Sequence, residues 1–196
     1  MTLPAGLLKS FEILAMLTGA GYAILAARRN RLCWIAGAVS SACAALLAGL
    51  RALPMQSALQ VFFVGMSVYG WVSWTRSSTT GDLPVGLWPY SWHIGAALVL
   101  LVLSFGSARL LAAETHAAWP LLDSLTTWFS LLATWLAARA KLENWLYWIV
   151  IDGALVYLFY VQGLPFLALL NVLFIAIAAA GFVAWRRRLR SQAVPA

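Results

Sequence analysis

The chain has 196 residues, of which 63% are hydrophobic and 10% charged, and its formal net charge is +7. A soluble domain carries about 25% charged residues, so this chain has too few polar side chains to cover a water-exposed surface. Its basic residues form short clusters between apolar runs rather than one polar face, which argues against a nucleic-acid partner. The composition therefore indicates a protein embedded in the lipid bilayer.

Seven apolar runs follow one another along the chain. Each is close to the roughly 17–25 residues that a membrane-spanning helix needs. The separators hold the glycine, proline and charged residues that are typical of loops. Because the runs do not alternate with polar residues, they are expected to be helices and not barrel strands. In chain order they cover residues 11–27, 32–50, 58–74, 94–111, 121–138, 145–161 and 164–185.

The distribution of positive charge predicts an orientation. Seven spans place the two termini on opposite sides of the membrane. Three Lys and Arg residues fall on the side of the N-terminus, and ten fall on the side of the C-terminus. Because cytoplasmic loops are enriched in Lys and Arg, we expect the N-terminus outside and the C-terminus in the cytoplasm, as in a multi-pass protein of the bacterial inner membrane.

The chain repeats itself at an offset of 111 residues without a gap. Equivalent arginines fall on the same predicted side, so the two copies are expected to be parallel and to need one linker helix between them. The predicted fold is an all-α integral membrane protein with seven transmembrane helices in a 3+1+3 order. The predicted parts are residues 1–76, 77–115, 116–190 and a tail at 191–196. The pairs that define the offset include Trp34 with Trp145, Pro54 with Pro165, Gly70 with Gly181, and Trp74 with Trp185.

The same offset pairs polar residues that lie inside apolar runs. Gln60 pairs with Asn171, and Ser41 pairs with Asp152. Polar groups at this depth usually face the interior of a helix bundle or a water-filled path. A third pair, Glu12 with Asp123, is interpreted as capping at two helix N-termini.

One face of the sixth predicted helix combines two indoles with an acid. Trp145, Trp148 and Asp152 are spaced i, i+3 and i+7, which places them on one side of a helix. The indoles would stack on a flat aromatic ligand while the carboxylate accepts hydrogen bonds from hydroxyl groups. A cationic ring would gain cation–π attraction as well. The alternatives are a belt of interfacial tryptophans and an aspartate that bonds to a neighbouring helix.

Four further polar residues complete the predicted substrate site. Gln60 and Asn171 supply amide donors and acceptors, and Thr127 and Ser130 supply hydroxyl groups. Their alternative role is hydrogen bonding and close packing between helices. No metal-binding or cofactor-binding pattern occurs in the sequence, and no metal or cofactor is expected.

These motifs resemble those of the PnuC-type vitamin transporters, over about residues 10–190. The resemblance lies in W-x-x-W-x-x-x-[N/D] at Trp145, Trp148 and Asp152, in YGW-x-x-W at residues 69–74, and in G-[YF]-x-x-W-R at residues 181–186. It implies a SWEET-related bundle that takes up the NAD precursor nicotinamide riboside by facilitated diffusion. It also implies that a cytoplasmic kinase phosphorylates and traps the substrate.

Several alternatives stay open. Members of this family also carry thiamine or another vitamin, and the carriers it resembles often assemble into homo-oligomers. A membrane enzyme lacks support, because no nucleophile–base pair or metal cluster accompanies Asp152, and we expect no enzyme activity. A purely structural membrane protein is a further, less favoured alternative.

Overall fold

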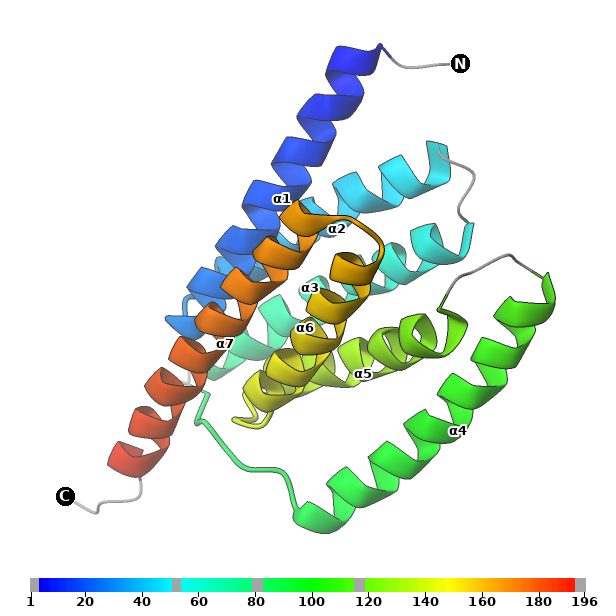
Figure 1. Cartoon of the computed structure of the whole chain (residues 1–196). Helices are drawn as coiled ribbons and strands as arrows, with labels where there is room; N and C mark the ends of the chain where they lie inside the picture. The colour runs from blue at the N-terminus through cyan, green and yellow to red at the C-terminus, as the bar shows by residue number, and fades with distance from the viewer. Residues whose placement is uncertain (1–3, 51–53, 79–82, 115–118, 193–196) are drawn as a thin grey trace. The chain divides into compact units, whose positions relative to one another are not determined.

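We describe the protein from a computed structural model of the whole chain (Figure 1). The structure describes residues 4–50, 54–78, 83–114 and 119–192. The predicted boundary at residues 115–116 and most of the predicted tail lie outside these ranges. Within them the regular structure is helical, and the prediction of seven helices is confirmed. The helices are α1 (Ala5–Ala27), α2 (Cys33–Leu50), α3 (Pro54–Ser78), α4 (Tyr90–Glu114), α5 (Pro120–Ala138), α6 (Asn144–Val161) and α7 (Pro165–Gln192).

Six of these helices are long and apolar enough to cross a membrane, so the protein is a multi-pass membrane protein. α3 is long enough, with 25 residues, but it is not apolar enough to be counted with the other six. The reason lies in its sequence, since α3 carries Gln60 together with several serine residues between its apolar positions.

Several helices begin earlier or end later than their apolar runs. α3 and α7 continue into residues near Arg76 and Arg190, because a helix need not stop where its apolar part stops. α1 begins at Ala5, so Glu12 lies beyond its first turn and the capping interpretation of Glu12 is wrong. Asp123 does lie in the first turn of α5, where its charge favours the helix dipole.

The chain folds as two units, residues 1–83 and 84–196. In the first unit, α2 packs against both α1 and α3. Two serines tie α2 to its neighbours: the Oγ of Ser40 donates to the carbonyl of Ala15 on α1 at 2.8 Å, and the Oγ of Ser57 on α3 donates to the carbonyl of Ala45 at 3.0 Å. Small polar residues of this kind let helices approach closely in lipid.

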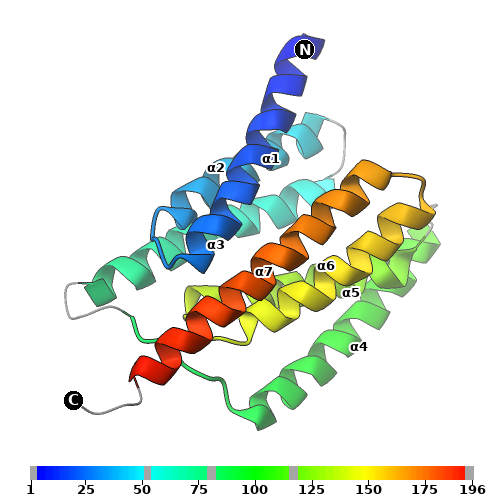
Figure 2. The same ribbon diagram turned by 60° about the vertical axis from the view of Figure 1, so that its left-hand side comes forward.

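In the second unit, α6 packs against both α5 and α7, and α4 packs along α5 (Figures 1 and 2). The segment before α4 lies against the turn between α5 and α6. There Gly86 forms an isolated parallel bridge, donating to the carbonyl of Ala140 at 3.1 Å and accepting from the amide of Leu142 at 3.0 Å. We call residues 84–89 the strap.

The turns that follow α1 and α5 have the same backbone form. Each contains one non-glycine residue with positive φ, Arg29 at 60° and Ala140 at 51°. In each turn a backbone amide reaches back to the last part of the helix, from Asn30 to Leu25 at 2.9 Å and from Lys141 to Leu136 at 2.8 Å. These residues are related by the offset of 111, so the sequence repeat has a local structural counterpart.

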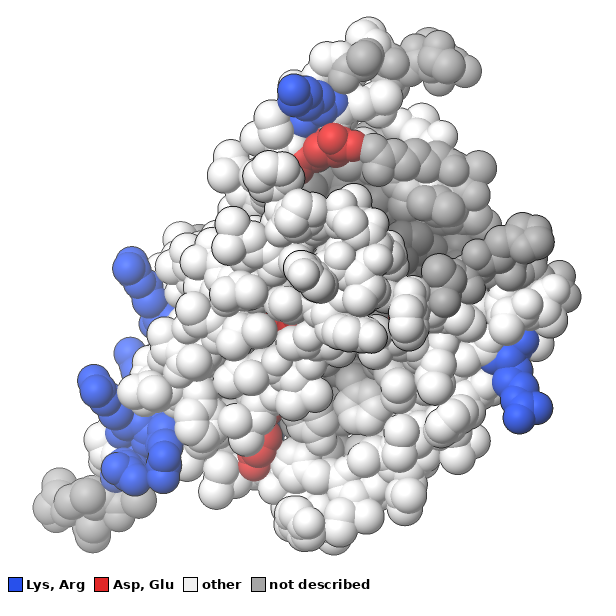
Figure 3. Space-filling view, in the orientation of Figure 1, with Lys and Arg blue, Asp and Glu red and all other residues white. Residues whose placement is uncertain are grey.

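Basic side chains concentrate at helix ends. Figure 3 shows Lys and Arg side chains gathered around the C-terminal end of α7, where the sequence reads RRRLR. Arg29 lies with its guanidinium carbon 5.1 Å from the ring centre of Trp74, and Arg139 lies 5.6 Å from that of Trp135. Such clusters are typical of the parts of a membrane protein that lie at the headgroups.

Candidate functional site

The first part of the candidate site is the middle of α6. The side chain of Asp152 is only 6% exposed, and Trp148, one turn earlier, is half-buried. Among the residues that the structure describes, the carboxylate of Asp152 has no hydrogen-bond partner. A buried acid inside an apolar span is unfavourable unless it faces a polar path or a ligand, so Asp152 is the residue that most demands a functional explanation.

Neighbouring helices supply the other predicted polar residues of this unit. Asn171 on α7 is 6% exposed, and its amide Nδ2 donates to the carbonyl of Leu167 at 2.8 Å, which uses one of its two donors. On α5, Thr127 and Ser130 are half-buried, and the Oγ of Ser130 donates to the carbonyl of Thr126 at 2.7 Å. The hydroxyl oxygen of Ser130 therefore remains an acceptor, because its proton is used within the helix.

Gln60, the remaining predicted amide, belongs to the first unit. It lies on α3, where its side chain is half-buried. The structure therefore collects six of the seven predicted site residues on the adjoining helices α5, α6 and α7, and it places the seventh on α3.

Trp145 has a clear packing role at the start of α6. It is 4% exposed, and its ring centre lies 5.5 Å from that of Trp185 on α7, with the two planes at 89°. A Cβ added to Gly181 would come within 2.7 Å of this indole, so the absence of a side chain there makes room for the ring. The indole N–H has no hydrogen-bond partner among the described residues, which fits a ring held by its faces and edges.

The first unit contains the same arrangement. Trp34 at the start of α2 is 1% exposed, and its ring centre lies 5.5 Å from that of Trp74 on α3, again at 89°. A Cβ added to Gly70 would fall on the indole of Trp34. We call each set of two tryptophans and one glycine an indole lock. Each residue of the first lock is 111 positions before its counterpart in the second lock.

A polar and aromatic cluster beside the strap was not predicted from the sequence. The Nδ1 of His93 on α4 and the hydroxyl of Tyr147 on α6 share a hydrogen bond of 2.9 Å. A carboxylate oxygen of Glu143 accepts from the amide of Trp88 at 2.8 Å and lies 3.7 Å from the Nε2 of His93. The cluster joins α4 to the start of α6, and its Tyr147 immediately precedes Trp148 in the sequence. The only signal in the sequence was a histidine, an acid and a tyrosine near predicted helix ends.

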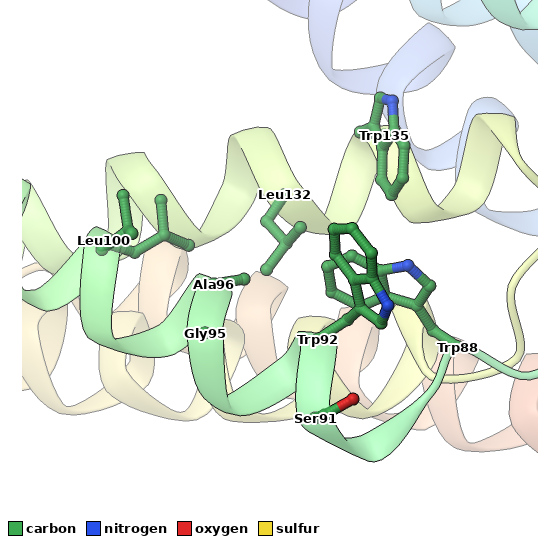
Figure 4. A pocket seen from close by; sticks show the side chains of 9 residues that line it. Trp88, Ser91, Trp92, Gly95, Ala96, Leu100, Leu132 and Trp135 are labelled. Carbon is green, nitrogen blue, oxygen red and sulfur yellow. The ribbon is translucent and has the colours of Figure 1, made fainter.

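A pocket of about 720 Å³ lies between α4 and α5 (Figure 4). Three indoles, of Trp88, Trp92 and Trp135, gather at one end of it, and aliphatic side chains such as Leu100 and Leu132 line the rest. It contains none of the predicted site residues. We call it the α4–α5 groove.

The arrangement suits binding and passage more than covalent chemistry. Within the second unit, the candidate site offers one acid, one amide, two hydroxyls and one half-buried indole on helices that are long and apolar enough to span a membrane. Among the described residues, no group of three His, Cys, Asp or Glu side chains converges to hold a metal ion. Apolar spans with a few buried polar groups are typical of an integral membrane protein with a polar path for a substrate, as in the transporter class.

Comparison with known proteins gives the family. Residues 9–187 match the model of the nicotinamide mononucleotide transporter family, and the chain belongs to that family. It is 26% identical over 160 residues to the nicotinamide riboside transporter PnuC of Escherichia coli (strain K12), covering 68% of this chain and 67% of that protein. The match to the protein of the same name from Shigella flexneri has the same values.

A solved structure shares the fold. The crystal structure of the vitamin B3 transporter PnuC superposes with a TM-score of 0.72, covering 91% of this chain and 81% of that one at 18% sequence identity. The all-helical membrane fold and the membership of a transporter family, both predicted from the sequence, are therefore confirmed.

Proposed function

We propose that this protein carries nicotinamide riboside into the cell across the bacterial inner membrane by facilitated diffusion. The observation that supports it most is the buried, unpaired carboxylate of Asp152 one turn from the half-buried indole of Trp148, within a span of a transporter-family chain. Nicotinamide riboside combines a cationic aromatic ring with a carboxamide and a ribose. The ring suits an indole and an acid, and the polar groups suit amides and hydroxyls.

In this proposal each predicted residue has a role. Trp148 stacks on the ring, and Asp152 either accepts hydrogen bonds from the substrate or balances its charge. Asn171 and Gln60 bind the carboxamide or ribose, with Thr127 and Ser130 as further partners. Trp145 contacts the substrate only through an edge of its ring, since its packing against Trp185 occupies much of the indole.

We further propose that α1–α3 and α5–α7 are parallel copies joined by α4, as in a 3+1+3 bundle, and that α3 also crosses the membrane. The two equivalent turns and the two equivalent indole locks support this. Rocking of one copy against the other would alternate access to the site. The ten-to-three bias of basic residues supports a cytoplasmic C-terminus.

Accumulation would then depend on chemistry in the cytoplasm. A passive carrier only equalises concentrations, so a kinase that phosphorylates the riboside would be needed to trap it. The second candidate substrate is thiamine, whose cationic ring and hydroxyl group fit the same acid and indole.

The experiment is a binding and uptake panel on the purified full chain. Calorimetry compares nicotinamide riboside, thiamine, riboflavin and a neutral nucleoside, and the same compounds are offered to liposomes with and without imposed ion gradients. We expect nicotinamide riboside to bind tightest and to equilibrate without a gradient. Tighter binding of thiamine would replace the proposed substrate, and gradient-driven accumulation in the absence of a kinase would exclude facilitated diffusion.

The role of the acid has its own test. Asp152→Asn keeps the size of the side chain and removes its charge. We expect this variant to bind the cationic riboside about tenfold more weakly while a neutral analogue is less affected, since 1.4 kcal/mol corresponds to about tenfold. Equal losses for both ligands would assign Asp152 to the shape of the bundle.

A further inference from the structure

The α4–α5 groove is shaped by small residues on α4. Gly95 and Ala96 form its floor, and the indoles of Trp88, Trp92 and Trp135 close one end of it (Figure 4). A Cβ added to Gly95 would meet nothing within 4 Å, so the space above this residue is open. We propose that the α4–α5 groove is a binding site for an anionic phospholipid, with an acyl chain along the groove and the phosphate at its tryptophan end.

The lining matches a hydrocarbon chain. Toward its far end the groove offers only aliphatic groups such as Val99, Leu100 and Leu132. From Tyr90, where α4 begins, to Leu100 the helix advances ten residues, which is about 15 Å at the helical rise. One leaflet accounts for half of the roughly 30 Å hydrocarbon core. The groove is therefore about as long as one acyl chain in its own leaflet.

The same lining argues against the vitamin as occupant. Ser91 and the indole N–H groups are the polar groups among the lining residues, and the lining includes no carboxylate and no carboxamide. A ribose buried there would leave most of its hydroxyl groups without partners. Trp148 and Asp152 lie outside the groove, so this inference does not depend on the proposed substrate.

Two cations lie at the tryptophan end. The guanidinium carbon of Arg139 is 5.6 Å from the ring centre of Trp135, which lines the groove. The Nζ of Lys141 donates to the carbonyl of Leu87 at 3.2 Å, next to Trp88. An amine keeps further donors after one hydrogen bond, and the positive charge of a guanidinium beside the groove attracts a phosphate.

Among the described residues, the acid beside the two cations is Glu143. It accepts from the amide of Trp88 and faces His93. Arg139 directly follows α5, and Trp88 and Trp92 flank the start of α4. Indoles and cations therefore meet at the depth of the lipid headgroups, with the apolar groove extending from them into the membrane.

The test measures lipid retained by the purified full chain. Detergent-solubilised protein is titrated with phosphatidylglycerol or with phosphatidylcholine of the same acyl chains, and bound lipid is counted by native mass spectrometry. Glycerol phosphate is a third arm that carries the phosphate without the chains. We expect one phosphatidylglycerol to be retained in preference to phosphatidylcholine, and no binding of glycerol phosphate.

Two glycine variants on one helix form a matched pair. Gly95→Phe places a ring in the groove, whereas Gly106→Phe adds the same ring to α4 at another open position, where a Cβ also meets nothing within 4 Å. We expect Gly95→Phe to abolish retention of the lipid and Gly106→Phe to leave it unchanged. Both variants should be monodisperse and unfold like the wild type, because neither site is filled by protein.

The charge is tested separately with Arg139→Gln and Arg139→Lys. A basic residue near an anionic headgroup contributes about fivefold in affinity, so Arg139→Gln should lower the preference for phosphatidylglycerol by about fivefold and Arg139→Lys should retain most of it. Equal binding of the two lipids to the wild type, or undiminished retention in Gly95→Phe, would overturn the proposal. Dimers that Gly95→Phe dissociates would also overturn it, by making the groove an interface between copies of this chain.

Discussion

Helices α1–α3 of the first unit and helices α5–α7 of the second agree at their ends and differ in the middle. The turn after α1 matches the turn after α5, and the lock of Trp34 matches that of Trp145 in both distance and angle. Along the central helix the pairs diverge, because Gly37 stands where Trp148 stands and Ser41 where Asp152 stands. The turns and indole locks at the helix ends therefore determine how the helices pack. The residues in the middle of α2 and α6 differ, so the two units carry different polar and aromatic groups there.

Each unit has one large aromatic residue at one of two paired positions, the pair Tyr22 and Ala133 or the pair Gly37 and Trp148. In the first unit Tyr22 on α1 supplies it, and a Cβ added to Gly37 would lie 3.0 Å from that ring. In the second unit the residue equivalent to Tyr22 is Ala133, which is fully buried, and the residue equivalent to Gly37 is Trp148 on α6. Moving the aromatic group to the central helix places it one turn from Asp152, which is what makes the second unit the better candidate for substrate binding.

The largest expected effect comes from removing an indole lock. Trp34→Ala and Trp145→Ala should each lower the free energy of unfolding by about 3–5 kcal/mol, because each leaves a cavity where a buried indole was. Thermal or denaturant unfolding of monodisperse protein would measure this. If Trp145→Ala kept its stability and lost only substrate affinity, the two locks would not be equivalent and the main role of Trp145 would be substrate binding.

Overfilling the same locks should have a smaller effect. Gly70→Ala and Gly181→Ala push a methyl group into the indoles of Trp34 and Trp145, and overpacking of this kind costs about 1–3 kcal/mol. Unfolding midpoints should fall by similar amounts in the two variants.

Two other glycines serve as controls for that experiment. A Cβ at Gly65 on α3 or at Gly153 on α6 would meet nothing within 4 Å. Gly65→Ala and Gly153→Ala should therefore keep the wild-type midpoint or raise it, because alanine favours the helix. A loss as large as that of the lock variants would mean that any methyl group on these helices disturbs packing.

Trp148→Ala should weaken substrate binding without a matching loss of stability. Stacking of a base on an aromatic side chain is worth about 1–3 kcal/mol, which corresponds to about 5- to 150-fold in affinity. Trp148→Phe should recover part of this. Trp92→Ala on α4 is the control, since Trp92 is 63% exposed and lies outside the candidate site. Wild-type affinity of Trp148→Ala in calorimetry would remove the stacking role.

The smallest change in stability should appear at Arg29 and Ala140, the two turn residues with positive φ. Replacement by glycine should change stability in opposite directions at these two positions. A non-glycine residue in this conformation is strained by about 1–2 kcal/mol. Ala140→Gly relieves the strain and loses only a methyl group, so its stability should rise by up to about 1 kcal/mol. Arg29→Gly also loses the contact with Trp74 and the hydrogen bond to Leu83, so its stability should fall. Differential scanning fluorimetry of both variants would resolve the two directions.

The positions of the helices were predictable because bilayer thickness sets the length of an apolar run. The predicted ends at residues 27, 50, 138 and 161 coincide with the ends of α1, α2, α5 and α6. The ends of α3, α4 and α7 were set too early, because apolar runs mark the part of a helix in lipid and these helices continue into polar residues. Glu12 was misplaced for the same reason at the start of α1.

For the candidate site, the sequence predicted which residues share a face of α6 but not what surrounds each of them. The spacing of Trp145, Trp148 and Asp152 places them on one side of α6, but spacing does not distinguish a packed ring from one that lines a path. The difference depends on Gly181 of α7, which leaves room for Trp145. The strap and its cluster were missed because their contacts join residues about fifty positions apart, such as Trp88 and Glu143, and no local pattern marks them.

The close approach at the two lock glycines has a consequence for how this gene can vary. Any nucleotide change that replaces a glycine by another residue adds at least a Cβ atom, and at Gly70 and Gly181 that atom collides with an indole. A change of amino acid at these codons therefore destabilises the protein unless the tryptophan on the neighbouring helix changes as well. Other positions of the two repeats can change more freely. The two glycines stay 111 positions apart, and the repeat can still be detected from them.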